Sequence, residues 1–277
     1  MQCGAAPRVS SAVVYYGTRM VTSSLSTIGR SVLLMRAVTV AIVRGILRRD
    51  FAVGEMVGQA VALLRVTTIP ALLVAVPFGA VVSVQVGALV DQVGANSLVG
   101  AASGMGIIRQ GAPLATGVLI GGVCASAIAA DLGSRAIREE LDAMRVMGVD
   151  PVARLIAPRL LALVLIAPML LIAIVAVAML IALVVSLAKF GVSAGGFWSS
   201  FGAFSSTADL AFAVLKAESG AVIVAVVAGL RGLEARGGPR GVADAVNSSV
   251  VLSITLIFLS TLALTQVETM FFPSNVA

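Results

Sequence analysis

Residues 131–158, which read DLGSRAIREELDAMRVMGVDPVARLIAP, hold the densest group of charged side chains between two long apolar stretches. Opposite charges recur there four residues apart. On a helix this spacing brings them together as the pairs Arg135–Glu139 and Arg138–Asp142. The segment is therefore expected to be helical, with a charged face available for electrostatic contacts.

The same segment has an apolar stripe and clear helix boundaries. The stripe has helical spacing and consists of Ile137, Leu141 and Met144. Gly148 is placed to end the helix as its C′ residue, and Asp150 followed by Pro151 is typical of the N-cap and first turn of the next helix. A short amphipathic helix is thus predicted between two apolar stretches.

Two functions fit such a helix. It is either a solvated loop helix, or a coupling helix that docks into a groove of a partner protein and moves the attached helices. Methionine side chains beside carboxylates suit an adaptable docking surface. On the second interpretation the docking residues are Glu139, Glu140, Leu141, Asp142, Met144, Met147, Gly148, Asp150 and Pro151.

Lys216 and Glu218 are ionisable side chains within another apolar stretch. Charges inside a membrane span are costly and are by default candidates for function. Because they are two residues apart they do not share a helix face, so one is expected to face a cavity and the other a neighbouring helix. The alternative is that both lie near the outer interface and extend toward water.

Common catalytic and metal sites need residues that this sequence lacks. It has no histidine and only two cysteines, Cys3 and Cys124, the second within an apolar stretch where it suits packing. No Gly-x-x-x-x-Gly-Lys-Ser/Thr motif occurs, because Lys189 and Lys216 both follow residues other than glycine. We therefore expect no enzyme activity, no catalytic residues, no metal and no cofactor on this chain. Without a P-loop, any ATP chemistry linked to its function would need ATP bound by a partner subunit.

The composition is typical of a membrane protein. The chain is 59% hydrophobic and 12% charged, with a mean hydropathy of +1.08, whereas soluble domains carry about 25% charged residues. The net charge of +6 comes mainly from arginine. It fits the basic cytoplasmic side of a membrane protein better than nucleic-acid binding, so no nucleic-acid partner is expected.

Five nearly charge-free stretches are long enough to cross a bilayer, which takes about 20 residues per helix. They are residues 66–90, 110–130, 160–188, 210–230 and 245–267. The glycine-rich residues 92–108 are interpreted as a short outside or re-entrant segment. The predicted fold is an all-α integral membrane protein with five transmembrane helices.

An interfacial helix is predicted before the first span. Residues 31–47 are apolar along one side through Val32, Leu33, Met35, Val43 and Ile46 and carry arginines elsewhere, which is typical of a helix lying in the membrane interface. The alternative is a sixth span, which the internal arginines disfavour.

The distribution of basic residues predicts the topology. Sixteen of the nineteen precede the first span or lie between spans two and three or spans four and five. Because Arg and Lys accumulate on the cytoplasmic side, we expect a multi-pass protein of the inner (plasma) membrane with its N-terminus in the cytoplasm and its C-terminus outside.

With these segments in place, the sequence resembles the MlaE/YrbE permeases, the membrane subunits of ABC-type lipid transporters that work with MCE-domain proteins. The match covers roughly residues 25–270 and is most specific at EELDAM (139–144), MGVDP (147–151) and PR (158–159). Weaker matches are residues 109–113, 129–133, 215–217 and 232–238. Two positions depart from the family pattern: Gln110 stands where many relatives have Glu, and residues 121–124 stand where some relatives have an Arg. The sequence is most similar to the actinobacterial Mce branch.

This resemblance implies a set of partners and a division of the chain. Residues 1–60 would form an N-terminal cytoplasmic and interfacial helical segment, and residues 61–277 the MlaE/YrbE-like permease domain. The implied partners are a separate ABC ATPase, a second permease copy or a paralogue, MCE-domain proteins and a lipid substrate.

A lipid pathway is expected along the first span. Phe78, Val82, Val86 and Leu89 recur at about helical spacing and supply the apolar wall that a lipid needs. From spacing alone the same stripe equally suits contact with membrane lipid, and the family resemblance favours the pathway. The alternative function is a stand-alone secondary transporter of a hydrophobic substrate, although the sequence shows no internal repeat of the kind common in that class.

Overall fold

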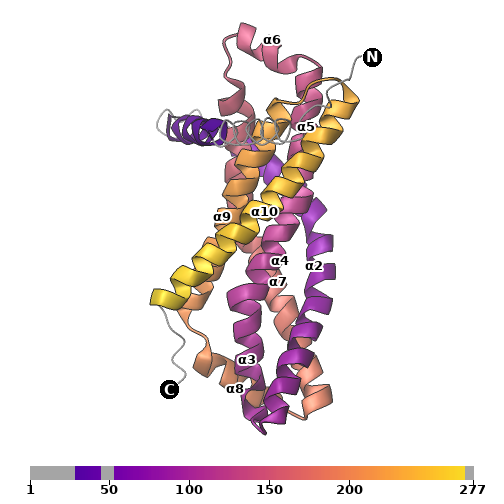
Figure 1. The fold of residues 1–277 in the computed structure, drawn as a ribbon, viewed down its shortest axis with the longest axis vertical. Helices are drawn as coiled ribbons and strands as arrows, with labels where there is room; N and C mark the ends of the chain where they lie inside the picture. The colour runs from indigo at the N-terminus through magenta and orange to yellow at the C-terminus, as the bar shows by residue number, and fades with distance from the viewer. Residues whose placement is uncertain (1–28, 45–52, 272–277) are drawn as a thin grey trace, which may run out of the picture.

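The computed structural model describes residues 29–44 and 53–271, and within these residues the chain is helical with no strand. The helices form an elongated bundle (Figure 1). In chain order the elements are α2 (Val53–Gln92), η1 (Asn96–Leu98), α3 (Val99–Met105), η2 (Gly106–Gly111), α4 (Ala112–Leu119), η3 (Ile120–Cys124), α5 (Ala125–Ile137), α6 (Glu140–Val146), η4 (Val152–Ile156), α7 (Ala157–Phe190), α8 (Ala194–Phe204), α9 (Thr207–Leu233) and α10 (Pro239–Phe271).

Five helices in the described residues are long and apolar enough to cross a membrane, which confirms the predicted all-α integral membrane fold. They are Gly54–Gln92, Asn96–Ile137, Val152–Phe190, Thr207–Leu233 and Pro239–Phe271, and each contains one of the predicted spans. The second and fourth lie at the centre of the bundle, with 61% and 50% of their most apolar windows buried, against 17% for the fifth.

Residues 92–108 were expected to form a separate outside or re-entrant segment, and this expectation is wrong. From Asn96 onward they are the first part of one long helix that ends at Ile137. The glycines serve close helix packing rather than a bend: a Cβ on Gly100 would lie 2.2 Å from the Phe197 carbonyl oxygen, and one on Gly104 would lie 2.3 Å from the Phe201 ring. Both contacts are with α8.

Small residues set the contact between α2 and α7. A Cβ on Gly79 would lie 2.4 Å from the carbonyl oxygen of Ala178. One turn further along α2, the Ser83 hydroxyl donates to the Ala182 carbonyl at 3.0 Å and lies 3.1 Å from the Ser186 hydroxyl. Small residues four apart on both helices let the backbones approach closely, as is usual for helices that pack within a bilayer.

A helix over residues 29–44 runs across the long axis of the bundle, as expected for an interfacial helix (Figure 1, dark indigo). It is anchored by Leu34 and Val38, which are buried, and by an ion pair of Arg30 with Glu234 at 2.8 Å. Val32 and Leu33, on the predicted apolar side, point away from the bundle, with 62% and 64% of their surface exposed. The predicted contact of this side with the membrane interface stays a prediction.

The proposed division at residue 60 stays a prediction, and much of residues 1–60, including Ile46, lies outside the described residues. At one end of the bundle α6 connects the second and third spans; at the other end α8 packs beside α3 (Figure 1).

Candidate functional site

The segment predicted to couple to a partner forms a sharp turn at one end of the bundle (Figure 1). The second span ends at Ile137, and Glu139 then adopts a left-handed conformation with φ of 60° before α6 begins at Glu140. After α6, Gly148 has φ of 77°, and the Asp150 carboxylate accepts from the Val152 backbone N–H at 3.0 Å. The predicted roles of Gly148 and Asp150 in ending one helix and starting the next are thus confirmed.

The predicted charge pairs of this segment are wrong because Glu139 breaks the helix. Arg135 instead reaches back one turn to Asp131 at 3.3 Å, and Arg138 pairs with Glu140 at 3.1 Å. Within α6, Asp142 pairs with Arg145 at 2.7 Å. The acidic residues therefore project from a turn and a separate short helix rather than from one continuous helical face.

Only part of the predicted apolar stripe is available to a partner. Leu141 is 4% exposed and Met144 packs partly against the core, so both hold α6 to its own bundle. The most exposed apolar side chains at this end are Val146 and Met147, at 89% and 70% exposure. Together with the exposed Asp142 they form the outward surface of α6.

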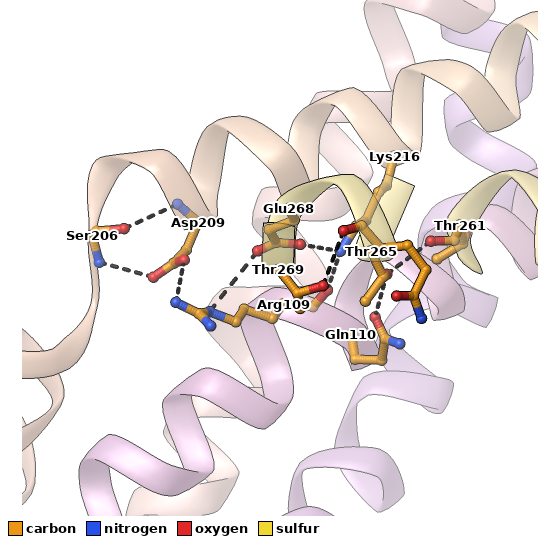
Figure 2. Close-up of polar contacts among 10 residues, drawn as sticks. Arg109, Gln110, Ser206, Asp209, Lys216, Thr261, Thr265, Glu268 and Thr269 are labelled. Carbon is orange, nitrogen blue, oxygen red and sulfur yellow. Dashed lines mark hydrogen bonds and ion pairs between the residues drawn. The ribbon is translucent and has the colours of Figure 1, made fainter. Parts of the chain in front are cut away.

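A network of buried charges lies in the half of the bundle away from α6 (Figure 2). The Lys216 ammonium donates to Glu268 at 2.5 Å and to the backbone carbonyl of Arg109 at 2.8 Å. The Arg109 guanidinium lies 2.8 Å from Asp209 and 3.9 Å from Glu268. Asp209 also forms a capping box with Ser206 at the start of α9.

The charged side chains of this network come from η2, α9 and α10. Arg109 lies in the π-helical turn η2, a wider turn that changes the register of the backbone carbonyls and is frequent at functional sites. Lys216 and Glu268 come from α9 and α10 and have 0% and 2% of their side-chain surface exposed. The two cations and two anions balance, so the network joins the second, fourth and fifth spans without a net charge.

A second polar contact lies next to this network. The Thr265 hydroxyl donates to the Gln110 side-chain carbonyl at 3.1 Å and is also placed to donate to the Thr261 backbone carbonyl at 2.8 Å (Figure 2). Within residues 29–44 and 53–271, no three His, Cys, Asp or Glu side chains are grouped so that they could hold a metal ion.

Comparison of the sequence with known proteins shows which family this chain belongs to. A family model described as Permease MlaE matches residues 56–267. The chain belongs to the MlaE permease family. The resemblance seen in its motifs is thereby confirmed, whereas its assignment to the actinobacterial branch stays a prediction.

Three curated relatives illustrate the MlaE family. The chain is 29% identical to protein TRIGALACTOSYLDIACYLGLYCEROL 1, chloroplastic, of Arabidopsis thaliana, over 63% of this chain and 50% of that protein. It is 31% identical to a probable ABC transporter permease protein of Synechocystis sp., over 66% of this chain and 69% of that protein. It is 27% identical to the intermembrane phospholipid transport system permease protein MlaE of Haemophilus influenzae, over 57% of this chain and 60% of that protein. The chain thus spans between half and about two thirds of the length of these relatives.

The in-membrane charges of this MlaE-family chain only partly follow the prediction. Lys216 does face a neighbouring helix, and its burial excludes the alternative that it extends toward water. Glu218 is partly exposed on another face of α9, and its Oε2 is buried without a hydrogen-bond partner within residues 29–44 and 53–271. Sequence reasoning missed Asp209 and Glu268, although a buried lysine needs an anion nearby, and Glu268 follows the predicted end of the fifth span directly.

The predicted pathway residues lie along one side of α2. Phe78 and Val82 face the second span: a Cβ on Gly111 would lie 2.0 Å from the Phe78 ring, and one on Gly106 would lie 3.4 Å from a Val82 methyl group. Val86 is partly buried and Leu89 is 64% exposed. The stripe therefore changes from a packed helix contact to an open surface toward the end of α2 that lies away from α6.

Proposed function

We propose that this chain is the membrane permease subunit of an ABC-type lipid transporter and that it works with a separate ATPase. Membership of the MlaE family supports the proposal, as do the five membrane-spanning helices and the lack of a P-loop motif in the sequence. The names of the Haemophilus and Arabidopsis relatives point to lipid transport. The chain itself performs no catalysis and binds no nucleotide.

The ATPase docks on α6. The observation that carries this proposal is the outward surface of α6, which presents the exposed carboxylate of Asp142 beside the exposed Val146 and Met147 at the end of the bundle. An apolar anchor bordered by charges is a common pattern of helix-in-groove recognition. Glu139 and Glu140 add negative charge at the preceding turn, while Leu141 and Met144 fix α6 to the spans so that force on α6 reaches α5 and α7.

Co-purification tests the docking surface. The double variant Glu140→Arg/Asp142→Arg should lose the P-loop ATPase while still inserting in the membrane, because charge pairs at a docking surface govern association and its register. Asp91→Arg is the matched control, since Asp91 is an exposed acid at the other end of α2. Retention of the ATPase by the double variant at the level of the control would refute docking on α6.

Orientation follows from the same proposal. The α6 end, the N-terminus and residues 231–244 face the cytoplasm, and α8 and the C-terminus face outside. Support comes from the basic residues, which concentrate near the α6 end of the spans. Two permease chains, either identical or one with a paralogue, form the core, and MCE-domain proteins bind the outer face.

The lipid passes along the open part of the α2 stripe, at Val86 and Leu89, with Phe78 and Val82 as its inner wall. Leu89→Trp adds bulk at a position that is 64% exposed and therefore leaves helix packing intact. It should reduce lipid transport, whereas Leu73→Trp, at a position 69% exposed on another side of α2, should not. Equal transport by both variants would remove this stripe from the pathway.

A further inference from the structure

A pocket between α2, α5 and the start of α7 lies near the α6 end of the bundle, far from the buried charge network. Its volume is about 230 Å³. The polar side chains that line it are Gln59, Asp131, Arg135 and Arg159, and the rest of its wall consists of five small or apolar residues of α2 and α5. A polar group at one side and an apolar wall at the other make the pocket amphipathic.

Arg159 is the central group of this pocket. Only 4% of the residue is exposed, although arginine is rarely buried unless it is paired. Its Nε donates to the Gln59 side-chain carbonyl at 2.9 Å, and its Nη2 donates to Asp131. Its Nη1 is buried and has no hydrogen-bond partner among the residues that the structure describes. A buried cationic donor left unpaired is costly, so an acceptor from outside the chain would be stabilising here.

The charge of the pocket favours an anionic acceptor. Asp131 is shared between Arg159 and Arg135, so one carboxylate faces two guanidinium groups. A second acid, Glu140, lies 3.9 Å from Arg135, beyond hydrogen-bond distance, and is already paired with Arg138 at 3.1 Å. The pocket therefore keeps an excess positive charge. Phosphate oxygens are well matched to guanidinium donors.

The depth of the pocket matches the headgroup region of a bilayer. The first three spans have 39 to 42 residues and are roughly 60 Å long at 1.5 Å per residue, against a hydrocarbon core of about 30 Å. Their ends therefore extend well beyond the hydrocarbon. Arg159 lies seven residues, or about 10 Å, from the start of its span. The exposed Arg65, on α2 and further from the α6 end than Gln59, indicates that the hydrocarbon begins beyond the pocket.

We infer that this pocket binds the phosphate group of a lipid headgroup from the leaflet on the α6 side, with Arg159 as the main donor and Arg135 as the second. Gln59 and Asp131 hold the Arg159 guanidinium in place, and the apolar wall contacts the glycerol and the first methylene groups. This site is distinct from the α2 stripe proposed as the pathway. A phosphate-binding site at this depth would select phospholipids before they enter the transporter or would anchor one permanently.

Lipid binding to the purified full-length protein tests the inference by native mass spectrometry. The probes are phosphatidylglycerol and a diacylglycerol with the same acyl chains, with inorganic phosphate as competitor. Wild-type protein should retain phosphatidylglycerol in preference to diacylglycerol, and Arg159→Gln should weaken that binding about tenfold to a hundredfold through loss of charge-assisted hydrogen bonds. Arg154→Gln is the matched control, because Arg154 is an exposed arginine nearby that pairs with Glu55.

Asp131→Asn separates binding from folding. The Asn side chain keeps a carbonyl oxygen that can accept from Arg159 and hold it in place, but it lacks the competing negative charge. The inference therefore predicts equal or tighter phosphatidylglycerol binding, whereas a purely structural role of the ion pair predicts weaker binding. Unchanged binding by Arg159→Gln, equal retention of diacylglycerol, or weaker binding by Asp131→Asn would each overturn the inference. Full displacement of the lipid by millimolar inorganic phosphate would assign the site to a soluble anion and overturn the lipid source. None of these measurements needs the ATPase or transport, so they stand independently of the proposed function.

Discussion

Breaking the Lys216–Glu268 pair should destabilise the protein far more than an ordinary surface change. Lys216→Met would leave the Glu268 carboxylate, whose side chain is 2% exposed, with the Arg109 guanidinium at 3.9 Å as its one cationic partner in the described part of the chain. Glu268→Gln would leave the Lys216 ammonium buried and held by the neutral carbonyl of Arg109. Removing one partner of a buried pair costs about 3–5 kcal/mol because the other charge remains without compensation.

The loss of stability in the double variant decides whether the two charges act as a pair. If the two single losses were independent, together they would cost about 6–10 kcal/mol. Lys216→Met/Glu268→Gln removes both charges, while Asp209 still neutralises Arg109 at 2.8 Å. The double variant should therefore cost no more than either single one, which corresponds to a coupling energy of at least about 3 kcal/mol.

Unfolding in mixed detergent and SDS micelles measures these free energies through the fluorescence of the single tryptophan, Trp198. This residue packs edge-on against Phe197 and Phe201 in α8, with ring centroids 5.7 and 5.8 Å away, so its signal reports folded structure at the α8 end of the bundle. Lys189→Met is the control, because Lys189 is exposed at the end of α7. Additive losses in the double variant, or single losses no larger than the control, would refute the claim that the two charges act as a pair.

Three further predictions test other parts of the structure. In a cysteine-free background, an impermeant thiol reagent should modify Ser199→Cys from outside intact cells and spare Val146→Cys; the reverse pattern would show that the topology is inverted. Gly79→Ala should lower thermal stability because its Cβ would lie 2.4 Å from the α7 backbone, whereas Gly54→Ala, whose Cβ would meet no atom of the described residues within 4 Å, should not. Equal melting temperatures would contradict close packing of α2 on α7. Glu139→Gly should preserve or raise stability by about 1 kcal/mol because glycine adopts a φ of 60° without steric cost, and a clear loss would show that the carboxylate itself holds the turn.

The sequence was sufficient for the spans, for the end of α6 at Gly148 and for the start of the next helix at Asp150, because these depend on local signals. The start of α6 at Glu140 was not predicted. Long apolar stretches form membrane helices whatever surrounds them, and Gly148 and Asp150 act on neighbouring backbone. The glycines at 100 and 104 misled the interpretation because their role depends on α8, about 100 residues away, against which they pack. A glycine that serves close packing and one that allows a bend look the same in a sequence.

The polar sites were harder to predict because their members are far apart in the chain. Lys216 pairs with a residue 52 positions later, and Arg159 reaches Gln59 across 100 positions. Charge pairing at helical spacing suggested local partners for Arg135 and Arg138, but the left-handed Glu139 changed which acids they contact. Only the three-dimensional arrangement shows that the scattered charges form two separate groups in opposite halves of the bundle.

ATP-dependent lipid movement tests the central claim most directly. The full-length chain is reconstituted in liposomes with its co-purifying ATPase and any associated subunits, and transfer of a fluorescent phospholipid is followed with ATP, without ATP and with the chain alone. A permease subunit of an ABC-type transporter requires ATP and the ATPase for transfer, and the Glu140→Arg/Asp142→Arg variant should abolish it. Equal transfer by the chain alone without ATP would contradict this account and favour a stand-alone secondary transporter.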